Sequence, residues 1–299
     1  MNIAVTGATG FLGRYLVNHL TTAGHHCRCW HRESSDRGGF DHPEKIQWLS
    51  GKLGDDSATQ SLVDGADAVV HAALHRPGKG FRGAEGDIPQ FVNNNVLGSI
   101  KLIDAAHRAA ANKFIFISTC AVHEIILDDR PLDEAHPLWP ASHYGAHKAA
   151  IEKFIHSYAT AENFDICALR PTGIYGLARP REKTKWFNLI QHVRQGKPVT
   201  STKGGKEVHA ADVARAVEIL LNASGTAGQA YNCYDMYIAD IHVAEIAKQI
   251  TGSVSPITAD NTGPKHQIVT TKIQNLGMTF PGESRLKETV AQLCTDPTS

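Results

Sequence analysis

Thr6-Gly-Ala-Thr-Gly-Phe-Leu-Gly13 joins a short apolar run at residues 2–6 to an amphipathic stretch at residues 11–23. Glycines at positions 7, 10 and 13 suit a turn in which the first permits the tight bend, the second lets the backbone approach a pyrophosphate, and the third lets a helix pack closely on a strand. The N-terminus of the following helix directs unpaired N–H groups toward phosphates. Such a turn between a strand and a helix is typical of a dinucleotide site, and a purely structural turn is the alternative.

Strand-like and helix-like segments alternate along the first part of the chain. Apolar runs predict strands at residues 25–30, 45–49, 66–71, 113–118 and 166–170. Apolar residues at helical spacing predict helices at 57–63, which Ser57 could cap, and at 88–111 and 144–161. This strict alternation predicts an α/β fold, a Rossmann-type doubly wound parallel sheet with helices on both faces.

The pattern changes after Pro171. Residues 172–207 hold glycine, proline and a basic stretch around one expected helix at 186–195. Helices at 211–222 and 241–251 and a strand at 229–234 are expected to follow. We therefore expect a dinucleotide-binding Rossmann domain at 1–171 plus about 208–240, with a small interleaved C-terminal substrate lobe at about 172–207 and 241–299.

Composition argues against several classes of protein. The 299 residues include 30 Lys plus Arg and 30 Asp plus Glu, and this balance argues against general binding to nucleic acid or to a membrane surface. No run of about 18 apolar residues predicts a transmembrane helix, and residues 1–13 do not resemble a signal peptide, so we expect a cytoplasmic protein. The six cysteines form no C-x-x-C pair and the 17 histidines are dispersed, which predicts free, mostly buried thiols and no metal site.

The end of the second strand indicates which dinucleotide the turn would bind. An acidic side chain there accepts hydrogen bonds from the ribose of NAD, whereas a basic one meets the 2′-phosphate of NADP. This strand ends Cys29-Trp30-His31-Arg32, with no acid at 31 or 32. Arg32 therefore favours NADP, with NAD as the alternative, and Arg14 is a candidate second contact. Arg32 could also be a surface arginine in a loop.

Tyr144 and Lys148 lie four residues apart in the helix predicted at 144–161. This spacing places a phenol and an ammonium on one face of the helix. The cation stabilises the phenolate and lowers a pKa that is ordinarily about 10, so the pair can act as a general acid or base. Upstream, a buried strand ends at Ser118-Thr119, at the sheet edge where doubly wound folds bind ligands. Thr119 could therefore hydrogen-bond the reacting oxygen.

Together these motifs resemble an extended short-chain dehydrogenase/reductase of the NAD-dependent epimerase/dehydratase family. The matching pieces follow the family's order: TGATGFLG at 6–13, HAA at 71–73, NVLGS at 95–99, ST at 118–119 with AV at 121–122, YGAHK at 144–148, LRPTGIYG at 169–176 and VHAADVA at 208–214. The resemblance spans residues 6–214, and LGM near 276 is similar to the family's C-terminal segment.

The resemblance implies roles for individual residues. Tyr144 is the acid or base, Lys148 also holds the nicotinamide ribose, and Thr119 takes the Ser/Thr position. Besides Arg32, Tyr144 and Lys148, the residues that would bind the cofactor are Gly7, Thr9, Gly10, Phe11, Leu12, Gly13, Leu53, Ala72, Ala73, Asn95 and Pro171. The family's dimer, in which the helices at 88–111 and 144–161 pair, makes a homodimer an expectation.

Departures from the family pattern concern the substrate. The dehydratase branch carries an acidic pair after the Ser/Thr position, but Cys120 and Ala121 stand here, so dehydration is not expected. Nucleotide-sugar enzymes usually have a longer stretch where only 32 residues separate Gly176 from His209. Gly205 stands where their diphosphate-binding arginine is expected. These differences favour a smaller substrate.

Five residues are candidate substrate contacts: His75, Cys120, Thr172, Arg179 and Trp186. The basic stretch at 179–185 could clamp a carboxylate or phosphate, or it could be a solvated helix start. Trp186 could stack on a sugar face or fill the core of the small lobe, and His75 could face substrate or lie in a loop without a role.

The sequence therefore predicts an NAD(P)-dependent oxidoreductase that interconverts a secondary alcohol and a ketone. Its substrate would be a small polar molecule, sugar-like or anionic. We expect it to bind neither nucleic acid nor a membrane. One alternative is a nucleotide-sugar epimerase that uses a transient keto intermediate. Another is a sensor that binds NADP without catalysis.

Overall fold

The computed structural model describes residues 1–78, 83–259 and 263–295. These residues form two compact units, each assembled from several segments of the chain. The first unit comprises Met1–Pro171, Val213–Cys233 and Ile268–Met278, and the second comprises Thr172–Asp212, Tyr234–Gln267 and Thr279–Ser299.

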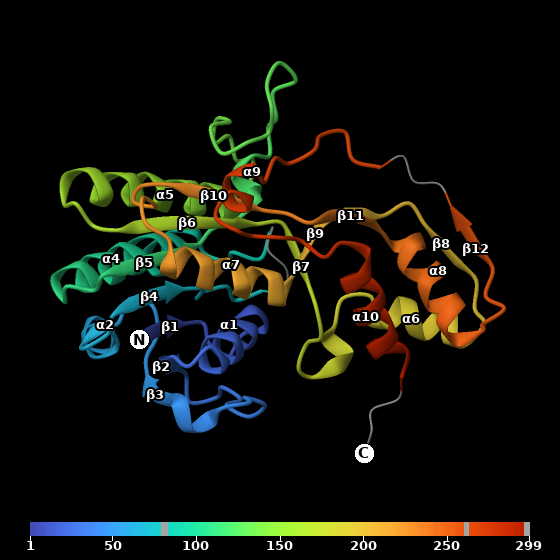
Figure 1. The fold of residues 1–299 in the computed structure, drawn as a ribbon, viewed down its shortest axis with the longest axis horizontal. Coiled ribbons are helices and arrows are strands. Elements are labelled where there is room, and N and C mark those ends of the chain that lie inside the picture. Colours follow the sequence, from blue (N-terminus) through green and yellow to red (C-terminus); the bar gives the residue numbers. More distant parts are fainter. Residues whose placement is uncertain (79–82, 260–262, 296–299) are drawn as a thin grey trace. The chain divides into compact units, whose positions relative to one another are not determined.

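A seven-stranded parallel sheet forms the centre of the first unit (Figure 1). Its strands are β1 (Asn2–Thr6), β2 (His26–His31), β3 (Ile46–Ser50), β4 (Ala68–His71), β5 (Lys113–Ile117), β6 (Ile166–Pro171) and β10 (Ala230–Cys233), in the order β10-β6-β5-β4-β1-β2-β3. Each neighbouring pair is parallel. The predicted Rossmann-type doubly wound sheet is confirmed.

The inner strands show why the sequence forms this sheet. Every residue of β4, β5 and β6 is buried, as expected for parallel strands that are covered on both faces. The register places Thr6 of β1 beside His71 of β4, and His71 beside Phe116 of β5. The carboxyl ends of these strands therefore lie at one edge of the sheet, where doubly wound folds bind ligands.

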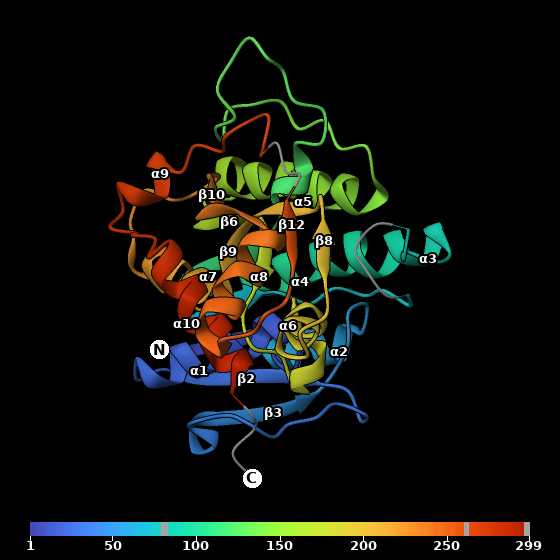
Figure 2. The ribbon, with the colours of Figure 1, turned by 90° about the vertical axis from the view of Figure 1, so that its right-hand side faces the viewer.

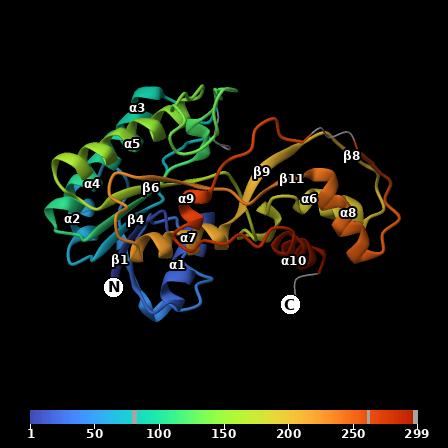
Figure 3. The ribbon, with the colours of Figure 1, turned by 45° about the horizontal axis from the view of Figure 1, so that its top comes forward.

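Helices cover both faces of the sheet (Figure 3). One face carries α2 (Asp56–Val63), α4 (Gly98–Arg108) and α5 (His143–Ala161), whose side chains Leu62, Leu102 and Ile151 belong to one buried cluster. The other face carries α1 (Phe11–Thr22) and α7 (Ala210–Asn222), which His19 and Glu218 join at 2.5 Å. Short elements complete the unit: η1 (Pro43–Lys45), η3 (Cys120–Val122) and α9 (Thr271–Gln274).

Two details of the helices differ from the sequence prediction. The helix expected at 88–111 is present, but it ends at Arg108 and is not a regular α-helix throughout: α3 (Ile88–Val92) passes through a π-helical turn, η2 (Asn93–Leu97), into α4. The helix expected at 57–63 begins at Asp56, and its cap is Asp55 rather than Ser57. The Asp55 carboxylate accepts a hydrogen bond from Ala58 N at 3.0 Å. Ser57 lies inside the helix and cannot make this capping bond.

The second unit contains two small sheets and a group of helices. Strands β7 (Gly173–Tyr175), β9 (Gly204–His209) and β11 (Met236–Ala239) form one sheet. In the other sheet β8 (Val199–Ser201) pairs with β12 (Ile257–Ala259), and Figure 2 shows these two strands side by side. After the short helix η4 (Arg181–Lys183), helices α6 (Phe187–Arg194), α8 (Asp240–Thr251) and α10 (Glu283–Cys294) pack on one another. Their core includes Tyr175, Trp186 and Ile190.

The six cysteines are all free thiols, and five of them are buried, as predicted. In the part of the chain that the structure describes, no helix combines the length and the apolar character needed to span a bilayer.

Candidate active site

The glycine turn brings β1 and α1 close to the segment that follows β4. Gly7 has a φ of +74°, and a Cβ there would lie 2.8 Å from the backbone of Ala72 and Ala73. A Cβ at Gly13 would lie 2.7 Å from Ala8 Cα. Both positions therefore require glycine. At Gly10 a Cβ would meet only Gly7 O, at 3.1 Å, so this side of the turn leaves room for another molecule.

A chain of buried hydrogen bonds supports the turn. Ala73 N donates to Thr6 Oγ1 at 3.1 Å, so the Thr6 hydroxyl proton is free to be donated to His71 Nδ1, 2.6 Å away. His71 Nε2 then donates to Ser99 Oγ at 2.8 Å, and Ser99 donates to Asn95 O. Burial lowers the pKa of His71 to about 3, so the ring stays neutral, as this chain requires.

Asn95 holds the loop that follows β4. Its Oδ1 accepts from His75 N and its Nδ2 donates to His75 O, both at 2.8 Å, while Nδ2 also donates to Phe91 O at 3.0 Å. Asn95 lies in the π-helical turn η2 and is buried. The structure thus brings together Asn95, predicted to bind the cofactor, and His75, predicted to contact substrate. The amide of Asn95 positions this loop.

Arg32 and Arg14 differ in their surroundings at the end of β2. Arg32 is exposed, and its backbone exchanges hydrogen bonds with Ser35 at 3.0 and 2.9 Å. Arg14 instead pairs with the Asp36 carboxylate at 3.2 Å and lies 5.1 Å from the centre of the Phe40 ring. Arg14 therefore holds the loop after β2, and Arg32 is the cation left exposed at the strand end.

Thr119, Tyr144 and Lys148 come together beyond the carboxyl end of β5. Thr119 caps η3, since its Oγ1 accepts from Ala121 N at 3.1 Å, and its side chain is hydrogen-bonded to the Tyr144 phenol. Lys148 lies one helical turn after Tyr144 on α5. Its Nζ donates to Ile117 O at 2.7 Å and lies 4.3 Å from the centre of the Phe116 ring.

The ionisation of this group follows from burial. Burial raises the pKa of Tyr144, so the lowering expected from Lys148 is wrong; the Thr119 hydrogen bond and the Arg76 guanidinium oppose the rise. Burial lowers the pKa of Lys148 to about 7, and the Glu152 carboxylate opposes this change. Tyr144 is therefore a protonated phenol at neutral pH. No sequence motif distinguishes Arg76, unlike its neighbour His75, so only the folded chain places its guanidinium near Tyr144.

The protein family follows from a comparison of the whole chain with known families. Residues 3–233 match the NAD dependent epimerase/dehydratase family. The chain belongs to this family.

Sequence relatives within the family cover different shares of the chain. A dTDP-D-glucose 4,6-dehydratase from Bos taurus is 32% identical over 167 residues, 54% of this chain and 45% of the dehydratase. The chain thus spans about half the length of the dehydratases that it matches at this identity. The low-salt glycan biosynthesis protein Agl12 from Haloferax volcanii is 28% identical over 304 residues, 93% of each chain.

Solved structures share the family fold. A UDP-glucose 4-epimerase from Thermotoga maritima, with UDP-glucose, has a TM-score of 0.80 at 20% identity over 98% of this chain and 97% of that one. The dTDP-glucose 4,6-dehydratase DesIV from Streptomyces venezuelae, with NAD and TYD bound, has a TM-score of 0.78 at 21% identity, covering 97% and 96%.

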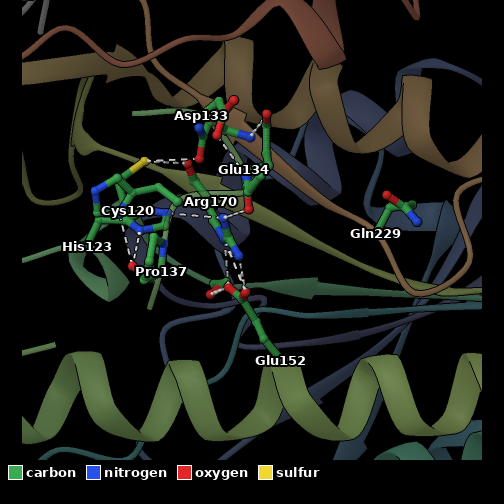
Figure 4. Close-up of polar contacts among 12 residues, drawn as sticks. Cys120, His123, Asp133, Glu134, Pro137, Glu152, Arg170 and Gln229 are labelled. Atoms are coloured by element: carbon green, nitrogen blue, oxygen red, sulfur yellow. Dashed lines mark hydrogen bonds and ion pairs between the residues drawn. The ribbon is translucent and has the colours of Figure 1, made fainter. Parts of the chain in front are cut away.

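This epimerase/dehydratase family member also contains a buried polar network around Arg170 and Glu152 (Figure 4). Arg170 Nε lies 3.0 Å from Glu152 Oε1, and Arg170 Nη2 lies 2.5 Å from Glu152 Oε2. Ser118 Oγ also donates to Glu152, and Arg170 Nη1 donates to His123 Nε2 at 3.1 Å. Burial and the Arg170 charge lower the pKa of His123 to about 4, so its ring is a neutral acceptor. The network joins α5 to β5 and β6.

Cys120 belongs to the same network. Its Sγ donates to Arg170 O at 3.0 Å, and burial raises the pKa of the thiol to about 12 (Figure 4). The thiol is thus protonated at neutral pH and serves as a hydrogen-bond donor to the backbone.

Several predicted site residues of this family member occupy the second unit. Trp186 is in the core, where its Nε1 donates to Asp240 Oδ1 at 3.0 Å, the packing role that the sequence also allowed. The basic stretch at 179–185 is partly used inside the unit: Lys185 pairs with the buried Glu207 carboxylate, and Arg181 donates to Thr295 O at 2.5 Å.

The other predicted positions lie as follows. Arg179 is exposed and Thr172 is half-buried, both in the second unit. In the first unit, Thr9 lies in the glycine turn, and Phe11 and Leu12 open α1. Leu53 is buried between β3 and α2, and Pro171 ends β6.

Proposed function

We propose that this protein is an NAD(P)-dependent oxidoreductase that interconverts a secondary alcohol and a ketone. The observation that carries this proposal is the hydrogen-bonded pair of Thr119 and Tyr144, with Lys148 one helical turn behind. The substrate oxygen would lie between the two hydroxyl groups, where Thr119 orients it and Tyr144 exchanges a proton with it. Because Tyr144 is protonated at neutral pH, it is ready to donate a proton to a ketone oxygen.

The glycine turn fits a dinucleotide. Glycine at positions 7, 10 and 13 leaves the backbone open at Gly10, and the first N–H groups of α1 have no partner within the helix. Phosphates would therefore meet Gly10, Phe11 and Leu12, and the other predicted cofactor residues would surround the remainder of the molecule. When bound, the nicotinamide supplies or accepts the hydride. Lys148 would hold the nicotinamide ribose.

The exposed Arg32 supports NADP as the dinucleotide. No acid stands at 31 or 32 to accept hydrogen bonds from the ribose, and Arg32 is free to meet a 2′-phosphate. NAD remains the alternative, because it is the dinucleotide bound in solved structures with this fold, such as DesIV.

A small polar substrate, sugar-like or anionic, is the favoured substrate class. Gly205 stands beside the buried Glu207 carboxylate in the second unit, where the nucleotide-sugar pattern would place an arginine. A nucleotide-sugar epimerase is the second candidate, and the similarity to a UDP-glucose 4-epimerase favours it. Epimerisation would use the same hydroxyl pair, with a keto intermediate that is reduced on its other face.

One experiment separates these candidates. Thermal shifts of the purified protein are measured with NADP, NAD, UDP-sugars and sugar acids, because a ligand that binds the folded state raises apparent stability. Turnover is then followed through the absorbance of the reduced nicotinamide, which rises for a dehydrogenase and shows no net change for an epimerase. We expect Tyr144→Phe to lower kcat by roughly 100- to 10,000-fold. Unchanged turnover in that variant would refute the proposed role of Tyr144, whereas a wild-type protein that binds a dinucleotide and turns over none of these substrates would favour the sensor.

A homodimer in the cytoplasm is also part of this proposal. Leu97 at the end of η2 and Phe154 on α5 are 45% and 41% exposed, which supports pairing through the helices of this face. We expect light scattering to give twice the chain mass for the wild type, and Phe154→Glu to give the monomer mass. A wild-type monomer at all concentrations would exclude this interface.

A further inference from the structure

Glu124 connects the two segments that carry the hydroxyl pair. It lies two residues beyond η3, which Thr119 caps, and its carboxylate accepts from Ala141 N at 2.5 Å. The same carboxylate accepts from Ser142 Oγ at 2.9 Å. Ala141 and Ser142 immediately precede α5, the helix of Tyr144. One side chain therefore joins the end of η3 to the start of α5.

Ser142 passes this connection into the first turn of α5. It is the N-cap residue, with extended backbone, and its Oγ accepts from Gly145 N at 3.1 Å. The hydroxyl proton of Ser142 is donated to Glu124, and its lone pair serves the helix. Tyr144 lies in the turn between Ser142 and Gly145, which this hydrogen bond closes.

The two segments are also in direct contact. A Cβ at Gly145 would lie 2.6 Å from Ala121 O, 2.7 Å from Pro140 Cβ and 3.2 Å from Glu124 Oε2. Ala121 N in turn donates to Thr119 Oγ1 at 3.1 Å. Glycine at 145 thus permits α5 to approach η3, and the Glu124 carboxylate holds the two together at that distance.

We infer that Glu124 is a positioning residue, whose carboxylate holds the start of α5 against η3 so that the Tyr144 phenol stays within hydrogen-bond reach of Thr119. This inference rests on the proposed function of the Thr119 and Tyr144 pair. Glu124 acts through Ser142 and the helix, and it need not touch the substrate.

The groups around Tyr144 determine in which direction its pKa should move when the Glu124 contacts are lost. The Thr119 hydrogen bond and Arg76 lower the pKa of the phenol, and Cys120 raises it. The His147 ring, 5.3 Å away between centroids, is neutral because burial and Lys148 lower its pKa to about 3. Loss of the connection would weaken the Thr119 hydrogen bond and raise the pKa of Tyr144. Loss of a nearby negative charge alone would lower it.

The test compares Glu124→Ala with Glu124→Gln in the full-length protein. Glutamine keeps an oxygen that can accept from Ser142 and Ala141, so its kcat and pH profile should stay close to wild type. Alanine should lower kcat by roughly 10- to 100-fold, because small misplacements of reacting groups cost that much, with little change in the Kd for NADP. It should also move the rising limb of the pH profile for alcohol oxidation to higher pH.

A readout without turnover separates this inference from the proposed function. The Cζ resonance of isotope-labelled tyrosine, assigned to Tyr144 by its loss in Tyr144→Phe, should change in Glu124→Ala and not in Glu124→Gln, even if no substrate is found. Ser142→Gly, which keeps a good cap residue but lacks the hydroxyl, should behave like Glu124→Ala and is a second route if alanine at 124 prevents folding.

Asp87→Ala is the matched control. Asp87 caps α3 through a 2.8 Å hydrogen bond from Gln90 N, so its loss costs a helix cap of the same kind and leaves the Glu124 and Ser142 hydrogen bonds in place. It should leave the Tyr144 resonance and the pH profile unchanged. The inference is overturned if both Glu124 variants move the rising limb of the pH profile to lower pH, which would show a charge effect. It is also overturned if Glu124→Ala and Ser142→Gly leave kcat, the pH profile and the Tyr144 resonance unchanged.

Discussion

Removing the charge of Glu152 should destabilise the first unit strongly. The Arg170 and Glu152 side chains are 4% and 5% exposed and approach to 2.5 Å. In Glu152→Gln the guanidinium would be left in the interior without its counter-charge. Breaking a buried pair by removing one partner costs about 3–5 kcal/mol, because the remaining charge is uncompensated.

The amount expected can be narrowed from the contacts. Glutamine keeps one oxygen that can accept from Ser118 Oγ and Arg170 Nε, so its cost should lie near the lower limit, about 3 kcal/mol. At about 2–4 °C per kcal/mol for a chain of this size, the midpoint of thermal unfolding should fall by roughly 6–12 °C. Glu152→Ala loses the oxygens as well and should cost more.

Urea denaturation followed by circular dichroism measures this difference. Glu283→Gln is the control, because it removes the charge from an exposed pair with Lys287, at 3.0 Å, and should leave the urea midpoint almost unchanged. The double variant with Glu152→Leu and Arg170→Met should be more stable than Glu152→Gln, since no unpaired charge remains. A Glu152→Gln midpoint equal to wild type would refute the reasoning.

Three further predictions concern the turn, the lysine and the cofactor. Gly7→Ala should cost roughly 3–5 kcal/mol in urea denaturation, from left-handed strain plus overlap with Ala72, whereas Gly24→Ala, with φ +91° and open space, should cost about 1–3 kcal/mol. Because the pKa of Lys148 is lowered to about 7, the unfolded state binds more protons than the folded state above pH 7, and the free energy of unfolding rises with pH from there toward 10.5. In Lys148→Met the slope of this free energy against pH should fall by the equivalent of about one proton. A slope equal to that of the wild type would contradict the prediction. Arg32→Ala should weaken NADP binding by roughly 10- to 100-fold in calorimetric titration and leave NAD unchanged, and equal loss for both would exclude a 2′-phosphate contact.

Local patterns were sufficient to predict the sheet and the glycine turn. The turn at 6–13 and the buried runs of β4 and β5 are short-range features, and each carries its own steric or burial signature. The spacing of Tyr144 and Lys148 follows from helix geometry alone, and the position of Thr119 follows from the end of a strand. These features depend on few long-range contacts.

The features that the sequence could not predict depend on packing between distant segments. His123, Glu152 and Arg170 come from three elements, and only the folded chain shows that they share one buried network. Arg14 was expected near a phosphate, but Asp36 and Phe40, more than twenty residues away, determine its direction.

The π-helical turn at Asn93–Leu97 acts as a spacer that sets the rotation of one helix relative to the next. An α-helix advances about 100° per residue, so deleting one residue here would restore regular hydrogen bonding and turn α3 by about that angle relative to α4. The Asn95 side chain would then point away from His75. The extra residue therefore permits one continuous stretch of chain to face both the loop after β4 and the His71 ring. A deletion in this stretch should disturb the hydrogen bonds that support the glycine turn.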